Sequence, residues 1–88
     1  MTDDLELQRL RQQIAAADEE ILELVNRRVE LVREIRAHKE EQGLPFVDAA
    51  QEDRLLARLR ELNRGPLSAE GVDQLFREIL AVVKDELD

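Results

Sequence analysis

The sequence predicts an all-α chain in which one long helix is followed by two shorter helices. An apolar seam runs from Leu7 to Ile35, and its steps alternate between three and four residues, as in a long helix that packs against another. Glycine and proline occur together near residues 43–45 and 65–66, and these breaks divide the 88 residues into three segments. No segment alternates apolar and polar residues in the way that predicts a strand.

The first predicted helix covers about residues 3–42, contains no glycine or proline, and ends at Gly43 and Pro45. A helix of about 40 residues is about 60 Å long, which is far longer than a compact chain of this size is wide. Half of the seam would then lie in solvent, so we expect an intertwined antiparallel homodimer. The seam comprises Leu7, Leu10, Ile14, Ala17, Ile21, Leu24, Arg28, Leu31 and Ile35.

The second and third predicted helices have clear start signals. Asp48 followed by Gln51 forms a capping-box pattern, which predicts a helix over about 49–63. Ser68 caps a helix predicted over about 69–87, so residues 1–88 are expected to form one domain. The apolar face of the last helix comprises Val72, Leu75, Phe76, Ile79, Leu80, Val82, Val83 and Leu87.

The composition excludes several classes of function. The net charge of −8 argues against nucleic acid or an acidic membrane surface as a partner. The absence of cysteine excludes a disulfide framework and thiol chemistry, and favours the cytoplasm. No apolar stretch is long enough to predict a membrane-spanning helix.

An arginine in the apolar seam is the strongest functional signal. A guanidinium that faces a helical core is costly unless an anion meets it, and Arg28 occupies such a position. Lys39 shares its face about 17 Å away, whereas Arg11 lies about 25 Å from Arg28 along the same helix. If the two helices cross near residue 22, Arg11 of the partner subunit falls near Arg33, between Arg28 and Lys39. Three cations from two chains would then surround each of two anion pockets.

Taken one at a time, these residues have simpler explanations. Arg11 is explained as a solvated helix arginine, and Lys39 as a charge that complements a helix C-terminus. Asp48 is explained as an N-cap, and Glu52 as a first-turn carboxylate favoured by the helix dipole. His38 has no metal-ligand spacing around it, so we expect no metal site. The functional interpretation therefore rests on the set.

An ordered set of residues along nearly the whole chain resembles a known family. The set comprises Leu10-Arg11, Ile14, Asp18, Ile21, Leu24, Arg27-Arg28, Leu31, Lys39, Pro45, Asp48, Glu52 and Leu55-Leu56, then Gly65-Pro66-Leu67-Ser68 and Leu75-Phe76-Arg77-Glu78-Ile79. It resembles the all-helical class of chorismate mutases, including the mutase domains fused to prephenate dehydratase or to the first enzyme of the shikimate pathway. The intertwined dimer of that family agrees with the expected geometry.

The resemblance implies the conversion of chorismate to prephenate in phenylalanine and tyrosine biosynthesis, a rearrangement that needs no nucleophile, metal or cofactor. It implies that carboxylates are bound by Arg28 and the partner's Arg11, that Lys39 contacts the ether oxygen, and that Glu52 accepts a hydrogen bond from the ring hydroxyl. The expected catalytic residues are Lys39, Arg28 and Glu52. The expected substrate-binding set is Arg11 of the partner subunit, Arg28, Lys39, Asp48, Gln51, Glu52, Val83 and Leu87.

Three of these positions depart from the family pattern. Gln51 stands where many members have arginine, and Val83 where a serine is common. Leu87 stands where a glutamine, or in some members a glutamate, makes the second hydrogen bond to the ether oxygen. Such changes affect rate more than binding, and some members are weak alone. The resemblance therefore also implies an activating complex with another shikimate-pathway enzyme.

Three other interpretations stay open. An isochorismate pyruvate-lyase shares this fold and a similar cation set, although Asp48 and Glu52 favour the mutase pattern. A weakly active or regulatory mutase-like dimer would bind an aromatic-pathway ligand without turnover, which fits the missing donor at Leu87. A plain antiparallel coiled coil explains the seam, but neither Arg28 nor two further capped helices.

Overall fold

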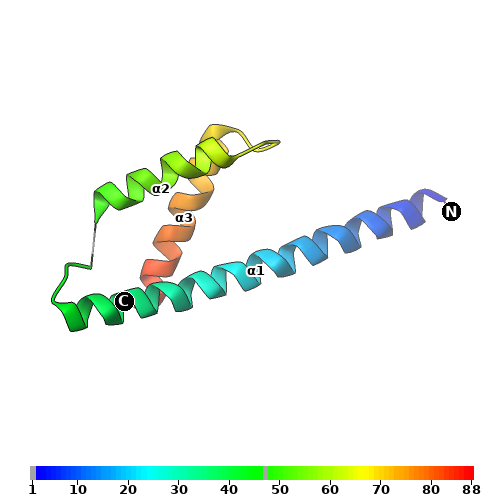
Figure 1. The fold of residues 1–88 in the computed structure, drawn as a ribbon. Coiled ribbons are helices and arrows are strands. Elements are labelled where there is room, and N and C mark those ends of the chain that lie inside the picture. Colours follow the sequence, from blue (N-terminus) through cyan, green and yellow to red (C-terminus); the bar gives the residue numbers. More distant parts are fainter. Residues whose placement is uncertain (1, 47) are drawn as a thin grey trace.

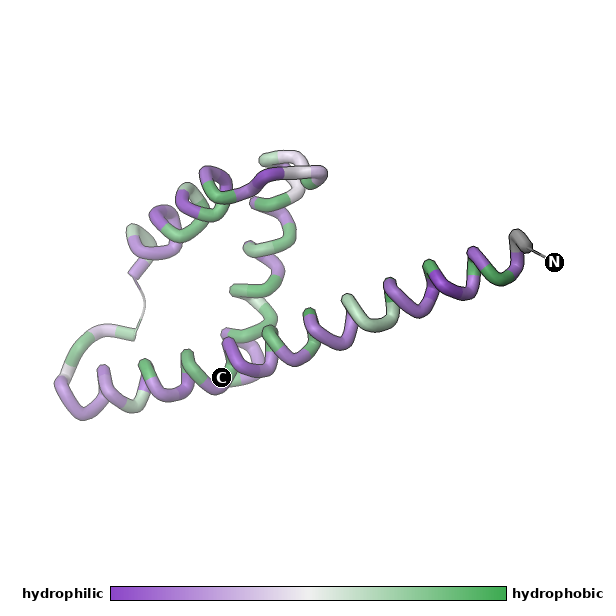
Figure 2. The backbone as a smooth tube through the Cα atoms, turned by 45° about the vertical axis from the view of Figure 1, so that its right-hand side comes forward, coloured by the Kyte–Doolittle hydropathy of each residue, from purple (hydrophilic) through white to green (hydrophobic). Residues whose placement is uncertain are grey.

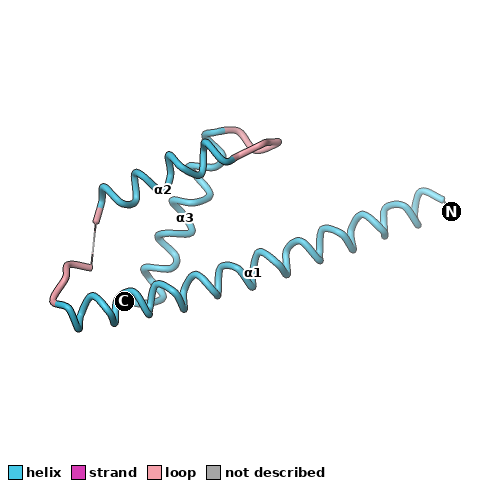
Figure 3. Tube along the Cα trace, viewed as in Figure 1, coloured by secondary structure: helices cyan, strands magenta, loops and turns pink. Residues whose placement is uncertain are grey.

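The computed structural model describes residues 2–46 and 48–88, which form three helices and two connecting segments (Figure 1). Helix α1 spans Thr2–Gln42, α2 spans Ala49–Leu62 and α3 spans Ala69–Leu87. Throughout this part of the chain every regular element is a helix, as the colours of Figure 3 show. The predicted all-α class is therefore confirmed.

The end of α1 is set by Gly43, whose φ of +67° lies in the left-handed region that favours glycine. The amide of Leu44 donates to the carbonyl of Lys39 at 2.8 Å, and the amide of Gly43 donates to the carbonyl of Glu40 at 3.3 Å. These bonds satisfy carbonyls at the helix end and turn the chain toward α2.

Side chains cap the starts of the two shorter helices. The Oδ1 atom of Asp48 accepts a hydrogen bond from the amide of Gln51 at 3.2 Å. The Oγ atom of Ser68 accepts one from the amide of Gly71 at 3.0 Å. Both predicted caps are confirmed, and each satisfies an amide that the helix itself leaves unpaired.

Helix α3 lies between the other two and packs against both, whereas α1 and α2 stay apart over the described residues (Figure 1). The buried apolar side chains in this part of the chain are Leu56 of α2 and Val72 and Val83 of α3. An ion pair between Arg36 of α1 and Asp88 at 2.9 Å ties the end of α3 to α1. The core is therefore small and centred on α3.

The chain is elongated because the N-terminal half of α1 projects beyond α2 and α3 (Figure 1). Its principal extents are 63 × 24 × 17 Å. The radius of gyration is 17.3 Å, whereas a compact domain of this length has a value of about 12 Å. Apolar residues recur along the projecting half (Figure 2), and Ile14 and Ile21 there are 62% and 57% exposed. A single chain thus leaves much of the α1 seam uncovered.

None of the helices in residues 2–46 and 48–88 is both long and apolar enough to cross a membrane.

On the projecting half of α1, the hydrogen bond from Arg9 lowers the pKa of the Glu6 carboxyl. This pair joins successive turns on the solvent-exposed face.

Candidate functional site

A cavity of about 590 Å³ lies between the three helices and is lined by one face of each. On the α1 side it is lined by Arg28, Val32, Ile35, Arg36 and Lys39. Each of these positions has another of them three or four residues away, which keeps them on one side of the helix. The same periodicity that predicted the seam therefore also builds this wall.

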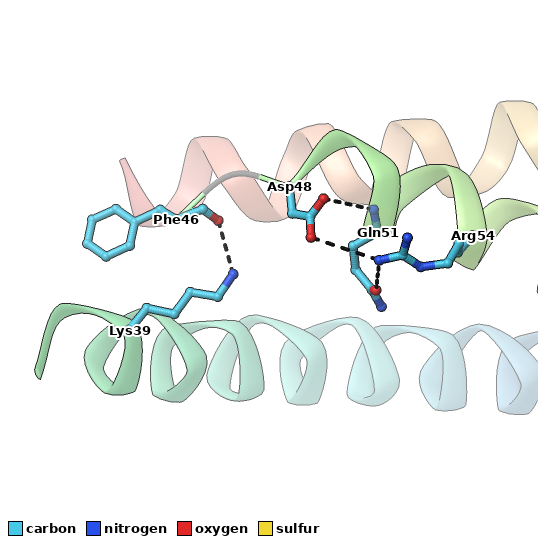
Figure 4. Close-up of polar contacts among 5 residues, drawn as sticks. All are labelled: Lys39, Phe46, Asp48, Gln51 and Arg54. Atoms are coloured by element: carbon cyan, nitrogen blue, oxygen red, sulfur yellow. Dashed lines mark hydrogen bonds and ion pairs between the residues drawn. The ribbon is translucent and has the colours of Figure 1, made fainter. Parts of the chain in front are cut away.

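Arg28 and Lys39 are both half-buried on that wall. Arg28 forms no ion pair with any residue of the described chain, so its charge faces the cavity uncompensated by a carboxylate. Lys39 Nζ donates to the carbonyl of Phe46 at 3.4 Å, and Figure 4 shows its side chain reaching from α1 toward that carbonyl. A hydrogen bond of this length is weak, so a ligand oxygen can replace it.

The first turns of α2 form the opposite wall, with Asp48, Gln51 and Glu52 among its residues. The guanidinium of Arg54 donates to Gln51 Oε1 at 2.9 Å and lies 3.9 Å from Asp48 Oδ2. Figure 4 shows Arg54 reaching back to both side chains, with the Gln51 amide directed toward α1. Because Arg54 occupies the amide oxygen of Gln51, the amide nitrogen is left to donate to a ligand.

Helix α3 closes the third side with Arg77, Leu80, Ala81, Val83 and Lys84. Val83 is 3% exposed, and its side chain presents no hydrogen-bonding group.

The structure brings six of the predicted site residues of this chain together and leaves two apart. Leu87 is half-buried and is not part of the cavity lining. Arg11 is exposed on the projecting half of α1, about 25 Å along the helix from Arg28. The residues brought together are Arg28, Lys39, Asp48, Gln51, Glu52 and Val83.

Sequence reasoning missed three further cations that line the cavity, namely Arg36, Arg77 and Lys84. The seven-residue spacing of Arg77 and Lys84 was the available signal, because it places both on one face of a helix. It also missed Arg54, whose spacing of three from Gln51 allows the observed contact.

The charge balance of the cavity is opposite to that of the whole chain. Among the described residues, five cations line it against three carboxylates, whereas the chain carries a net charge of −8. A cavity with this local excess attracts a small anion, and its walls strengthen the attraction relative to open water. The carboxylates are Asp48, Glu52 and Asp53.

A second, apolar groove of about 250 Å³ lies where α1 and α3 diverge. Arg28 is the polar residue in its lining, so this side chain borders both spaces. The groove continues the exposed seam of α1. The remaining lining residues are Ile21, Leu24, Val25, Leu75, Phe76 and Ile79.

Comparisons with known proteins agree on one family. The family described as chorismate mutase type II matches residues 10–86. The bifunctional chorismate mutase/prephenate dehydratases of Pseudomonas aeruginosa and Stutzerimonas stutzeri are 34% and 33% identical in alignments of 86 residues, and each match covers 92% of this chain. The chain spans only 24% of the length of each of these relatives.

Solved structures of chorismate mutase from Thermus thermophilus are similar in length and fold. Form I is 37% identical with a TM-score of 0.86, and the match covers 89% of this chain and 98% of that chain. Form II is 38% identical with a TM-score of 0.86, and the match covers 91% of both chains.

Proposed function

This chain belongs to the chorismate mutase type II family, and on that basis we propose that it catalyses the rearrangement of chorismate to prephenate. The observation that carries the proposal is the cavity in which Arg28 and Lys39 of α1 lie opposite Asp48 and Glu52 of α2. Chorismate has two carboxylates, a ring hydroxyl and an ether oxygen. The cavity offers cations and an acceptor for these groups.

Each residue has a role that follows from its chemistry. Arg28 binds a carboxylate, because its charge has no carboxylate partner among the described residues. Lys39 leaves the Phe46 carbonyl and donates to the ether oxygen. Glu52 accepts a hydrogen bond from the ring hydroxyl. Asp48 fixes the first turn of α2, and so sets the position of Glu52.

The rearrangement is unimolecular, so the protein's task is to hold one conformer and to stabilise charge. Binding both carboxylates places the enolpyruvyl arm over the ring, which removes rotational freedom before the reaction. Negative charge develops on the ether oxygen as its bond to the ring carbon breaks, and the Lys39 ammonium stabilises it. The side chains of Val83 and Leu87 have no hydrogen-bond donor. We therefore expect kcat to be reduced more than the affinity for the substrate.

The active unit that we propose is a homodimer. Support comes from the exposed seam of α1, the apolar groove beside it, and the position of Arg11 on the projecting half. An antiparallel second copy would cover the seam and bring Arg11 of the partner subunit to the cavity. We also propose a cytoplasmic location and an activating contact with another enzyme of the pathway, since the curated relatives are bifunctional proteins.

The test is the loss of chorismate absorbance with purified protein, followed by identification of the product. We expect prephenate, and we expect Lys39→Ala to reduce kcat by about 10²–10³-fold, the usual loss for one donor to a developing oxyanion. Arg58→Ala, at an exposed ion pair with Glu61 on α2, is the control and should leave the rate unchanged.

Other outcomes would contradict the proposal in distinct ways. Release of pyruvate from isochorismate, without prephenate from chorismate, would identify a pyruvate-lyase. Chorismate binding without any product would identify a regulatory module.

A further inference from the structure

Helix α3 presents to the cavity a face with two cations that the proposed mechanism does not use. Arg77, Ala81, Lys84 and Asp88 follow one another at steps of four, three and four residues, which keeps them on one face. The first three of these residues line the cavity. The fourth forms the ion pair with Arg36 of α1 at 2.9 Å.

This ion pair puts Lys84 near the cations of α1. Lys84 lies one helical turn before Asp88, and the amide of Asp88 donates to its carbonyl at 3.0 Å. Lys39 lies three residues after Arg36, close to one turn of α1. Because Arg36 and Asp88 join the two helices, the part of the α1 wall that carries Lys39 and the part of the α3 wall that carries Lys84 meet at the same end of the cavity.

The ammonium of Lys84 has no competing partner in the described part of the chain, where it forms neither an ion pair nor a side-chain hydrogen bond. A lysine in the last turn of a helix complements the terminal carbonyls, but that role does not require it to line a cavity. Its neighbour Val83 offers no donor there.

The α2 wall supplies no cation to the cavity among the described residues. Gln51 is neutral, and Arg54 is outside the lining because it turns back to Gln51 and Asp48. A dicarboxylate in this cavity therefore meets positive charge on the α1 and α3 sides only. If Lys39 is engaged at the ether oxygen, the cations of the α3 side, Arg77 and Lys84, are the ones left to face a carboxylate there.

We propose that Lys84 is a substrate-binding residue, whose ammonium pairs with one carboxylate of a dicarboxylate substrate at the α3 wall. The proposal rests on the proposed function for the identity of that substrate. Its distinctive expectation is that binding, rather than the chemical step, depends on Lys84, because a carboxylate carries the same charge in the substrate and in the transition state.

The experiment compares Lys84→Met, Lys84→Arg and Arg58→Met. Lys84→Met keeps the apolar stem and removes the charge, so KM for chorismate should rise about 10- to 100-fold while kcat changes less than about 3-fold. The KM of the variant should also depend less on salt. Lys84→Arg should restore most of the affinity. Arg58→Met removes the same charge from the outer surface of α2 and should leave KM unchanged.

An unchanged KM in Lys84→Met would overturn the inference. A second result would also overturn it, namely a higher KM with a melting temperature lowered by the same amount in Lys84→Met and Lys84→Arg. Lys84 would then only stabilise the end of the helix. Calorimetric binding of chorismate and of a bicyclic dicarboxylate that mimics the transition state separates this inference from the proposed function. Lys84-dependent binding without turnover would refute the mutase activity and support the Lys84 site. Turnover that is indifferent to Lys84 would do the reverse, and loss of both binding and turnover in the unmodified chain would refute both.

Discussion

At the scale of single residues, Arg28 stands out because it borders both the polar cavity and the apolar groove. A leucine would fit the seam better, and replacing a partly buried charge by a hydrophobe of similar size is often neutral or stabilising. We therefore expect Arg28→Leu to keep or raise the melting temperature while abolishing chorismate binding. The neighbouring exposed residue gives the control, and Arg27→Leu should retain binding.

Calorimetry and thermal denaturation of the two variants check this expectation. A strongly destabilised Arg28→Leu protein would mean that the guanidinium has a structural partner, and the functional assignment of this seam arginine would then be wrong.

The sequence predicted Arg28 from a break in the seam, Asp48 from a cap, and Lys39 and Glu52 from family resemblance. All four line the cavity. It did not locate Lys84, whose place in the cavity depends on how α3 is rotated about its own axis. That rotation is set by packing against two helices at once, and the periodicity of α3 alone does not specify it. Leu87 illustrates the same difficulty, since the last turn of α3 puts it outside the cavity lining.

At the scale of elements, the starts of α2 and α3 depend on one side-chain cap each. Ser68 lines neither the cavity nor the apolar groove, and its Oγ atom accepts a hydrogen bond from the amide of Gly71 at 3.0 Å. Ser68→Ala removes this acceptor and should cost about 1 kcal/mol of stability. We expect a melting temperature lower by a few degrees, with KM for chorismate unchanged. Ser68→Asp retains an acceptor and should melt like the unmodified protein. A Ser68→Ala variant with unchanged melting temperature would show that the cap contributes nothing.

The three helices could be predicted from the sequence, because caps, helix-breaking residues and apolar periodicity are local signals. Their arrangement was not. An apolar face on α2 shows that the face is buried, but not that it packs on α3 rather than on α1. Arg36 and Asp88 are far apart in the sequence, so the ion pair by which they join α3 to α1 could not be predicted from local pattern either.

At the scale of the whole molecule, the single chain is incomplete as a folded unit. Three apolar side chains are buried among the described residues, whereas four of α1 are exposed, namely Leu10, Ile14, Ile21 and Leu24. A partner helix over this seam would bury apolar area in proportion to its length. The proposed homodimer therefore accounts for stability as well as for the distance between Arg11 and the cavity.

Mixing inactive variants tests whether the active site is shared between subunits. Arg11→Ala and Arg28→Ala should each be inactive as homodimers, because every site then lacks one of the two arginines. In a heterodimer, the subunit with intact Arg28 meets the partner's intact Arg11, so one of its two sites is complete. With random exchange half of the dimers are mixed, and activity should return to about one quarter of the unmodified value.

A chain carrying both substitutions supplies the control. Mixed with the Arg11→Ala chain, it creates no complete site in any dimer, so no activity should return even though subunits exchange equally well. Native mass spectrometry of both mixtures establishes that heterodimers have formed. If the first mixture contains heterodimers and stays inactive, each cavity works with the residues of its own chain. An Arg11→Ala homodimer that keeps full activity would show instead that Arg11 is an ordinary solvated arginine and that the projecting half of α1 serves assembly alone.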